Sequence, residues 1–328
     1  MNKLDQIEGK GLIIHHWDTD GISSTVLLLK KLDKDNIGNI TPTLGNYYLT
    51  DEEIKNCRGY DFIIISDMSL PEENIAKLKT QTEKILIFDH HLGKIIPNVF
   101  HYNPIIKGED PDRYPSTSWI INEYLRNPIN LYAILGVIGD HEKRIKKNPF
   151  IWNHIDDFSK KNNLSFEKLL KMVYLLDSNY KLGDKTAVET APWELLDIES
   201  TEEILENHKW NNNLKLLEKE IESQISQSLE IKDGIIIKRM NTPYNIISTV
   251  TRKLAWNNRK PTIVINTGFF KDSDQLYVRT IDKDMKPLIE KGKNLGFKCG
   301  GKKEVLGAII PKEKTDLFLE DILSYLKS

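Results

Sequence analysis

Short apolar runs that end in polar residues recur along the first part of the chain. Residues 11–16, 62–65 and 85–88 are such runs, and helix-like sequence follows each of them. The first helix is expected over residues 22–32, and the second opens at Pro71, where a proline suits the first turn. Strands buried on both faces read as continuous apolar runs, and their alternation with helices predicts an α/β fold with a parallel sheet.

The pattern changes after residue 150. Residues 151–231 are mostly helical in character, with a capping box at Ser200–Glu203 and one long amphipathic helix expected from Trp210 to Leu229. Strand patterns then return and a helix closes the chain, with strands expected at residues 235–238, 262–266, 275–280 and 305–310 and the helix at 317–326. We therefore expect an α/β domain over 1–150, a helical insertion and linker helix over 151–233, and a smaller α/β domain over 234–328.

Composition narrows the class of protein but does not name a substrate. Hydrophobic residues make up 39% and charged residues 29% of the chain, which is typical of a soluble globular protein. The net charge of -2 does not by itself indicate a nucleic-acid partner. The two cysteines lie far apart, and no apolar run approaches about 18 residues. The polar first ten residues contain no signal-peptide core. These features predict a cytoplasmic protein without a membrane partner.

Four polar clusters follow the apolar runs, and they hold the candidate chemistry. They are His16-x-Asp18-x-Asp20-Gly21, Asp67, Asp89-His90-His91 and Gly139-Asp140-His141. Ligands gather at the carboxyl ends of parallel strands, so we expect the first three clusters to meet. Carboxylates and imidazoles without thiolates suit Mn²⁺ or Mg²⁺ better than structural zinc. Two such ions about 3.5–4 Å apart can clamp a phosphate ester, and Asp67 is the candidate shared ligand.

Each cluster taken alone also has an ordinary structural explanation. Asp20-Gly21 is a common turn, Asp67 could cap the helix near Pro71, and Asp140 could cap a helix end. Ser116-Thr117-Ser118 is expected to cap the helix that follows it. Two adjacent histidines after an aspartate at a strand end are harder to explain in this way. The four clusters together favour the metal-site hypothesis.

Four segments resemble, in order, the motifs of the DHH superfamily of phosphoesterases. They are IIHHWDTDGISS, IIISDMSL, LIFDHHLG and LGVIGDHE, within residues 11–145. Near the C-terminus, YVRT and FKCGGKKEVLGAII are similar to the arginine strand and the Gly-Gly-His loop of the DHH-associated substrate domain. The first motif most resembles the archaeal RecJ-like group. The resemblance implies a parallel-sheet DHH catalytic domain that binds metal, a helical connecting region, and a smaller α/β substrate-binding domain.

The resemblance also implies a role for each motif residue. His16 and Asp18 would hold one Mn²⁺ or Mg²⁺ ion, Asp67 would bridge, and the second ion would be held by Asp20, His90 and Asp140. His91 would contact the substrate phosphate, and Asp89 would orient a neighbouring imidazole. Substrate contacts would come from Arg279, Gly300, Gly301, Lys302 and Lys303. Lys302 departs from the family pattern, which usually has histidine there, and this puts the usual recognition of the terminal nucleotide in doubt.

The function that follows is a RecJ-like exonuclease that cuts single-stranded DNA or RNA from an end to mononucleotides by a two-metal mechanism. One alternative is a nanoRNase or phosphoadenosine-phosphate phosphatase that acts on very short oligonucleotides. Another is a replisome-associated subunit, with residues 151–231 as the surface for a replication or repair partner. A family II pyrophosphatase is disfavoured by the Gly300-Gly301 loop. The motifs do not select between DNA and RNA, a cleavage direction or an oligomeric state.

Overall fold

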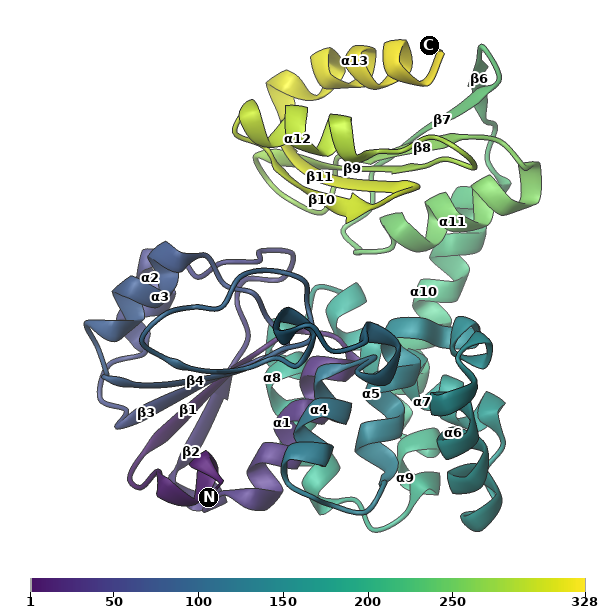
Figure 1. Cartoon of the computed structure of the whole chain (residues 1–328). Helices are drawn as coiled ribbons and strands as arrows, with labels where there is room; N and C mark the ends of the chain where they lie inside the picture. The colour runs from purple at the N-terminus through teal and green to yellow at the C-terminus, as the bar shows by residue number, and fades with distance from the viewer. Residues whose placement is uncertain (1, 328) are drawn as a thin grey trace. The chain divides into compact units, whose positions relative to one another are not determined.

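The computed structural model describes residues 2–327, which form two compact units (Figure 1). The first unit runs to Tyr180 and includes Asp184–Asn212, and the second includes Lys181–Gly183 and the chain from Asn213 onward. The helices between residue 150 and Asn212 therefore belong largely to the same unit as the N-terminal sheet. None of the helices in the described range is both long and apolar enough to cross a membrane.

The first unit is built on a five-stranded parallel sheet; the apolar runs predicted its parallel α/β type and its three central strands, but not the two edge strands. Its order is β2-β1-β3-β4-β5, with β1 at Gly11–His15, β2 at Ile37–Ile40, β3 at Phe62–Ser66, β4 at Lys84–Phe88 and β5 at Phe100–Tyr102. Every residue of the central strands β1 and β3 is buried, which explains their continuous apolar sequence. On one side of the sheet lie α1 (Thr19–Lys31), α4 (Thr117–Tyr124) and α5 (Leu131–His141), and on the other α2 (Asp51–Asn56) and α3 (Glu72–Lys79) (Figure 1).

Helix α1 begins three residues earlier than its apolar pattern predicts. The side chain of Asp18 accepts a hydrogen bond from the Gly21 amide and caps the helix, so Asp20 lies in the first helical turn. The expected turn at Asp20-Gly21 before the helix is therefore wrong. Helix α3 starts after Pro71, so Asp67 is not its cap.

Four more α-helices follow α5 in the first unit before α10 begins. They are α6 (Pro149–Lys161), α7 (Phe166–Lys181), α8 (Lys185–Asp197) and α9 (Thr201–Glu206). The predicted capping box is present at the start of α9, where the Glu203 carboxylate accepts a hydrogen bond from the Ser200 amide. The long amphipathic helix is α10 (His208–Ser226), which starts two residues before its predicted first residue and ends three residues before its predicted last one.

The second unit holds a mixed six-stranded sheet in the order β10-β11-β9-β8-β7-β6. The strands are β6 (Glu230–Lys232), β7 (Ile235–Met240), β8 (Thr262–Asn266), β9 (Ser273–Arg279), β10 (Lys298–Lys302) and β11 (Val305–Pro311). Only β7 and β8 pair in parallel, and the other neighbours are antiparallel. The remaining helices of this unit are α11 (Ile247–Asn258), α12 (Lys286–Asn294) and α13 (Thr315–Lys327).

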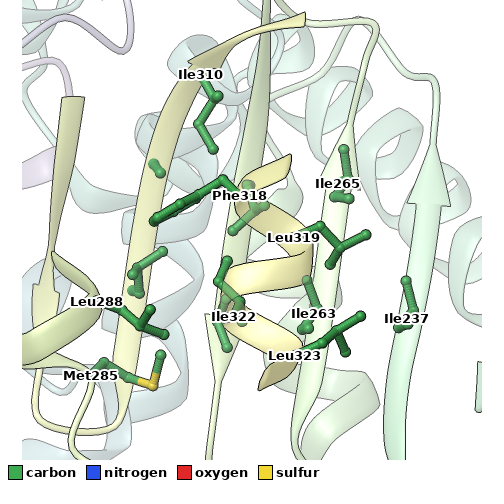
Figure 2. Close-up of a cluster of buried hydrophobic side chains, with 14 of the residues drawn as sticks. Ile237, Ile263, Ile265, Met285, Leu288, Ile310, Phe318, Leu319, Ile322 and Leu323 are labelled. Carbon is green, nitrogen blue, oxygen red and sulfur yellow. The ribbon is translucent and has the colours of Figure 1, made fainter. Parts of the chain in front are cut away.

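Helices cover both faces of the second sheet. On one face α12 and α13 pack Leu288, Phe318 and Ile322 against Ile263 and Ile310 of the strands (Figure 2). On the opposite face, side chains of α10 and α11 pack against β7 and β8. Each unit thus has a hydrophobic core of its own.

Candidate metal centre

The predicted metal ligands come together where β1, β3 and β4 end and where α5 ends. Their ligand atoms form three groups, within each of which all atoms lie within 4.8 Å of one another: His16–Asp18–Asp67, Asp20–His90–Asp140 and Asp67–His90–His91. Asp67 and His90 each belong to two groups, so the three groups form one continuous cluster.

Asp67 lies between two imidazoles. Its Oδ2 is 3.7 Å from His16 Nδ1, and its Oδ1 is 3.6 Å from His90 Nε2. The outer carboxylates are closer: Asp18 Oδ2 is 2.8 Å from His16 Nδ1, and Asp140 Oδ2 is 3.2 Å from His90 Nε2. The two carboxylate oxygens of Asp67 thus face the two halves of the cluster, which is the arrangement expected of a shared ligand.

The donor atoms fit a divalent cation. The buried Nε2 of His16 has no hydrogen-bond partner among the described residues, and the buried Nδ1 lies 2.8 Å from Asp18 Oδ2. Buried polar nitrogens of this kind call for an ion or a water. Burial lowers the pKa of His90 to about 4, which keeps the imidazole neutral and able to donate its lone pair.

Electrostatic repulsion in the cluster also calls for a cation. The pKa of the Asp67 carboxyl is raised well above its ordinary value, first by burial and then by the charges of Asp20, Asp18, Asp140 and Asp89. A cluster of carboxylates that repel one another in a low-dielectric site is stabilised when cations bind between them.

The backbone is also constrained at this site. Asp67 has a φ of 60°, in the left-handed region that non-glycine residues rarely adopt, and its amide donates to the Phe88 carbonyl at 2.9 Å. Strained backbone of this kind concentrates at functional sites. At Gly21 an added Cβ would lie 2.2 Å from the His16 carbonyl oxygen, so the first motif has no room for a side chain there.

The start of α4 holds two of the carboxylates in place. The Thr117 amide donates to Asp20 Oδ2 at 2.7 Å, and the Ser118 amide donates to Asp20 Oδ1 at 2.9 Å. The Thr117 hydroxyl donates to Asp67 Oδ1 at 2.9 Å. Ser116 caps the helix, as the sequence predicted. The contacts with the carboxylates were not predicted, although three successive capping residues between two motifs are a signal for them.

His91 extends from the cluster toward solvent. Its side chain is 47% exposed, whereas Asp89, which binds its Nδ1 at 2.7 Å, is buried. Burial alone would lower the pKa of His91, but the hydrogen bond and the charge of Asp89 raise it. The same bond lowers the pKa of Asp89 although burial opposes this. His91 is therefore held as a hydrogen-bond donor that an outside ligand can reach.

Two further residues outside the proposed ligand set support the site. Asp177 of α7 accepts hydrogen bonds from the Thr19 amide at 3.1 Å and from the Thr19 hydroxyl at 2.7 Å, at the start of α1. His15 is buried, with Nδ1 at 2.7 Å from the His16 carbonyl oxygen and Nε2 at 3.0 Å from Asn39 Nδ2. It therefore fixes the backbone beside the cluster.

The predicted substrate residues all lie on the second unit. Arg279 ends β9 and pairs with Val305 of β11, and the two glycines lie on β10. At Gly301 an added Cβ would lie 2.0 Å from the Val305 carbonyl oxygen, and φ is 155°. Lys303 is exposed, and the side chain of Lys302 lies outside the part that the structure describes.

Comparisons with known proteins find one matching family profile and several solved structures with a similar fold. A sequence profile described as the DHH family, N-terminal domain, matches residues 10–148. No curated protein matches the sequence. RecJ from Thermus thermophilus in complex with Mn²⁺ is 17% identical, with a TM-score of 0.70 over 98% of this chain and 52% of that one. This chain therefore spans about half the length of that relative.

Two other solved structures are similar over most of both chains. An exonuclease RecJ bound to manganese is 18% identical, with a TM-score of 0.65 over 98% of this chain and 92% of that one. A DHH domain described as a member of the s1p family of ribosomal proteins is 14% identical, with a TM-score of 0.72 over 97% of this chain and 86% of that one. The Thermus protein has also been solved with Mg²⁺. These likenesses establish the fold, and the manganese and magnesium complexes agree with the donor set described above.

Proposed function

We propose that this chain, which carries the N-terminal domain of the DHH family and has a DHH-family phosphoesterase fold, is a metal-dependent exonuclease that removes mononucleotides from an end of single-stranded DNA or RNA. The observation that carries the proposal is the pairing of His16–Asp18–Asp67 with Asp20–His90–Asp140 in one cluster. Paired divalent ions are a common solution for phosphodiester hydrolysis.

The cluster divides naturally into two ligand sets. His16 and Asp18 would hold one ion, Asp20, His90 and Asp140 would hold the other, and Asp67 would be shared. When bound, Mn²⁺ or Mg²⁺ would supply Lewis acidity toward the phosphate oxygens and lower the pKa of water.

The chain itself orients these groups and contacts the substrate. The Thr117 and Ser118 amides fix both oxygens of Asp20, so that the carboxylate cannot rotate away from its neighbours. His91, held by Asp89 and exposed, would donate a hydrogen bond to the scissile phosphate as charge accumulates in the transition state. The second unit would bind the rest of the nucleic acid. The contacts would come from the side chains of Arg279 and Lys303 and from the backbone of β10 at Gly300 and Gly301.

The test uses DNA and RNA ladders, from dinucleotides to about 20-mers, labelled at the 5′ or the 3′ end. We expect Mn²⁺-dependent release of mononucleotides at all lengths and none in EDTA. Asp67→Ala should remove nearly all of the hydrolysis while circular dichroism shows an intact fold. Asp35→Ala, which changes an exposed aspartate in a surface turn, is the matched control.

The same ladder separates the alternatives. Cleavage confined to dinucleotides and trinucleotides would replace the exonuclease by an enzyme for very short oligonucleotides. A folded protein that binds Mn²⁺ but cleaves no strand would overturn the enzymatic proposal. If Asp67→Ala keeps a tenth or more of the wild-type kcat at saturating metal, the role given to Asp67 is wrong.

A further inference from the structure

Trp256 is an exposed tryptophan on α11 of the second unit. Its side chain is 59% exposed, whereas tryptophan side chains are on average highly buried. The guanidinium carbon of Arg252 lies 5.5 Å from the centre of the indole, and that of Arg279 lies 5.3 Å away. Both cations thus lie within cation–π distance of the indole, and more than half of the side chain is still exposed to solvent.

The surrounding sequence is strongly cationic. From Gly234 to Lys271 the chain contains seven lysines and arginines and no aspartate or glutamate, within a protein whose net charge is -2. Four of the seven, Arg252, Lys253, Arg259 and Lys260, lie on α11 or in the turn that follows it. None of these four is fully buried. A phosphate chain passing Trp256 would therefore meet a local concentration of positive charge.

Two glycines lie beside Tyr277 on the adjoining strands of the sheet. Because alternate residues of a strand point to opposite faces, Arg279 lies on the same face as Tyr277, which packs beside the α11 cluster. Gly307 of β11 pairs with Tyr277 and with Gly300 of β10, and nothing lies within 4 Å of a Cβ added at Gly300. The two glycines therefore add no side chain to this face between Tyr277 and β10.

We propose that Trp256, with Arg252 and Arg279, forms a subsite that stacks one nucleobase of single-stranded nucleic acid and binds the phosphates beside it. The proposal rests on the proposed function and adds a second point of attachment, on the second unit, for a base remote from the scissile bond. An indole offers a stacking face for any base, and the two guanidiniums suit the flanking phosphates, so the subsite binds without sequence preference.

The charge around the indole favours a nucleic acid over an apolar peptide. A protein-binding hot spot around a tryptophan is expected to have apolar or mixed surroundings, whereas this indole is flanked by two arginines and lies in a long acid-free segment. Exposed aromatic side chains within a basic surface are the usual combination in proteins that bind single strands.

The experiment measures binding of a fluorescent oligothymidylate of about 15 nucleotides to the full chain in EDTA, which prevents cleavage. A strand of equal length that lacks all bases serves as a second probe. We expect Trp256→Ala to weaken oligothymidylate binding by about tenfold and to leave binding of the abasic strand unchanged. Trp256→Phe should bind within about threefold of wild type. Leu295→Ala, which removes another exposed apolar side chain of the same unit, is the control.

Arg252→Ala should weaken binding of both strands and reduce the dependence of log Kd on log salt by about 0.7 for one lost phosphate contact. The proposal is overturned if Trp256→Ala binds oligothymidylate as wild type does, or if it loses affinity equally for both strands. It is also overturned if the wild-type protein binds neither strand.

The two proposals fail in different ways. If the wild type binds oligothymidylate through Trp256 but Mn²⁺ brings no cleavage, the stacking subsite stands and the exonuclease does not. If cleavage occurs and Trp256→Ala leaves KM unchanged, the exonuclease stands and the subsite does not. When both hold, the substitution raises KM for long strands and leaves kcat within about threefold, because a remote contact contributes mainly to uniform binding.

Discussion

Asp67 shows how a single residue can be poorly suited to the metal-free fold. Its side chain is 2% exposed, and four other carboxylates raise its pKa. Its φ of 60° adds backbone strain. An acid whose pKa is raised by folding destabilises the folded state at every pH where it is ionised. A residue with these costs is retained for a reason other than stability, and the proposed bridging role supplies one.

We therefore predict that Asp67→Asn stabilises the metal-free protein while it removes hydrolysis. Asparagine keeps an oxygen that accepts from the Thr117 hydroxyl, and it tolerates the left-handed conformation. Removing one buried charge should raise the Tm in EDTA by about 2–4 °C for each ~1 kcal/mol gained. Differential scanning calorimetry in EDTA and a cleavage assay in Mn²⁺ measure the two effects. Asp35→Asn should change neither, and a Tm at or below that of wild type would contradict the electrostatic argument.

At the level of the elements, three helices meet at one carboxylate. Asp20 lies in the first turn of α1, the first turn of α4 donates two amides to it, and Gly136 of α5 packs against it. A Cβ added at Gly136 would lie 2.0 Å from Ser118 Oγ and 2.2 Å from Asp20 Oδ1. The absence of a side chain at Gly136 thus allows α5 to approach the ligand closely.

Gly136→Ala should therefore destabilise the fold and weaken metal binding together. Alanine would favour the helix by about 1 kcal/mol, but displacement of Asp20 and α4 should cost about 1–3 kcal/mol more than that gain. We expect the Kd for Mn²⁺, measured by calorimetric titration, to rise by about 10- to 100-fold, as it does when the groups that orient ligands are disturbed.

Gly139→Ala on the same helix is the control, because an added Cβ makes a milder contact there than at Gly136. Its nearest neighbour would be Thr19 Cβ at 3.1 Å, a contact that a small shift relieves. We expect a much smaller change in both stability and Mn²⁺ affinity. Equal effects of the two substitutions would show that the close approach at Gly136 is not what positions Asp20.

At the level of the whole molecule, the chain consists of two units with separate cores. The proposed metal ligands all lie in the first unit, and the packed face formed by α12 and α13 lies in the second (Figure 2). Units with independent cores need not unfold in one cooperative step. Metal binding should then stabilise one unit selectively.

Calorimetry should accordingly show two unfolding transitions, of which only one responds to metal. At a free Mn²⁺ concentration of about 100 times Kd, linkage contributes about 2.7 kcal/mol to the unit that binds it. For a unit of this size, that corresponds to a shift of roughly 5–10 °C. Asp67→Asn should lose the shift. A single transition that moves as a whole would show that the two units unfold together.

The sequence by itself determined the three central strands of the first sheet, β1, β3 and β4, and the carboxylate and imidazole groups that meet at their ends, but not the edge strands β2 and β5. A parallel strand covered on both faces must be continuously apolar, and polar side chains can project only at its end. Residues 62–65 and 85–88 therefore predict two strands, and they also predict that Asp67 and His90 lie at the carboxyl ends of these strands. The segments within residues 11–145 that resemble DHH motifs added a predicted assignment of the metal ligands.

Only the tertiary structure decided how the ligands are held. The Thr117 amide reaches Asp20 across 97 positions of sequence, its hydroxyl reaches Asp67 across 50, and Thr19 reaches Asp177 across 158. The start of α1 at Thr19 and the cations that flank Trp256 were likewise not evident from local patterns. The reason is physical: periodicity reports which face of an element is buried, whereas a hydrogen bond between distant residues depends on how the elements pack, which no local pattern contains.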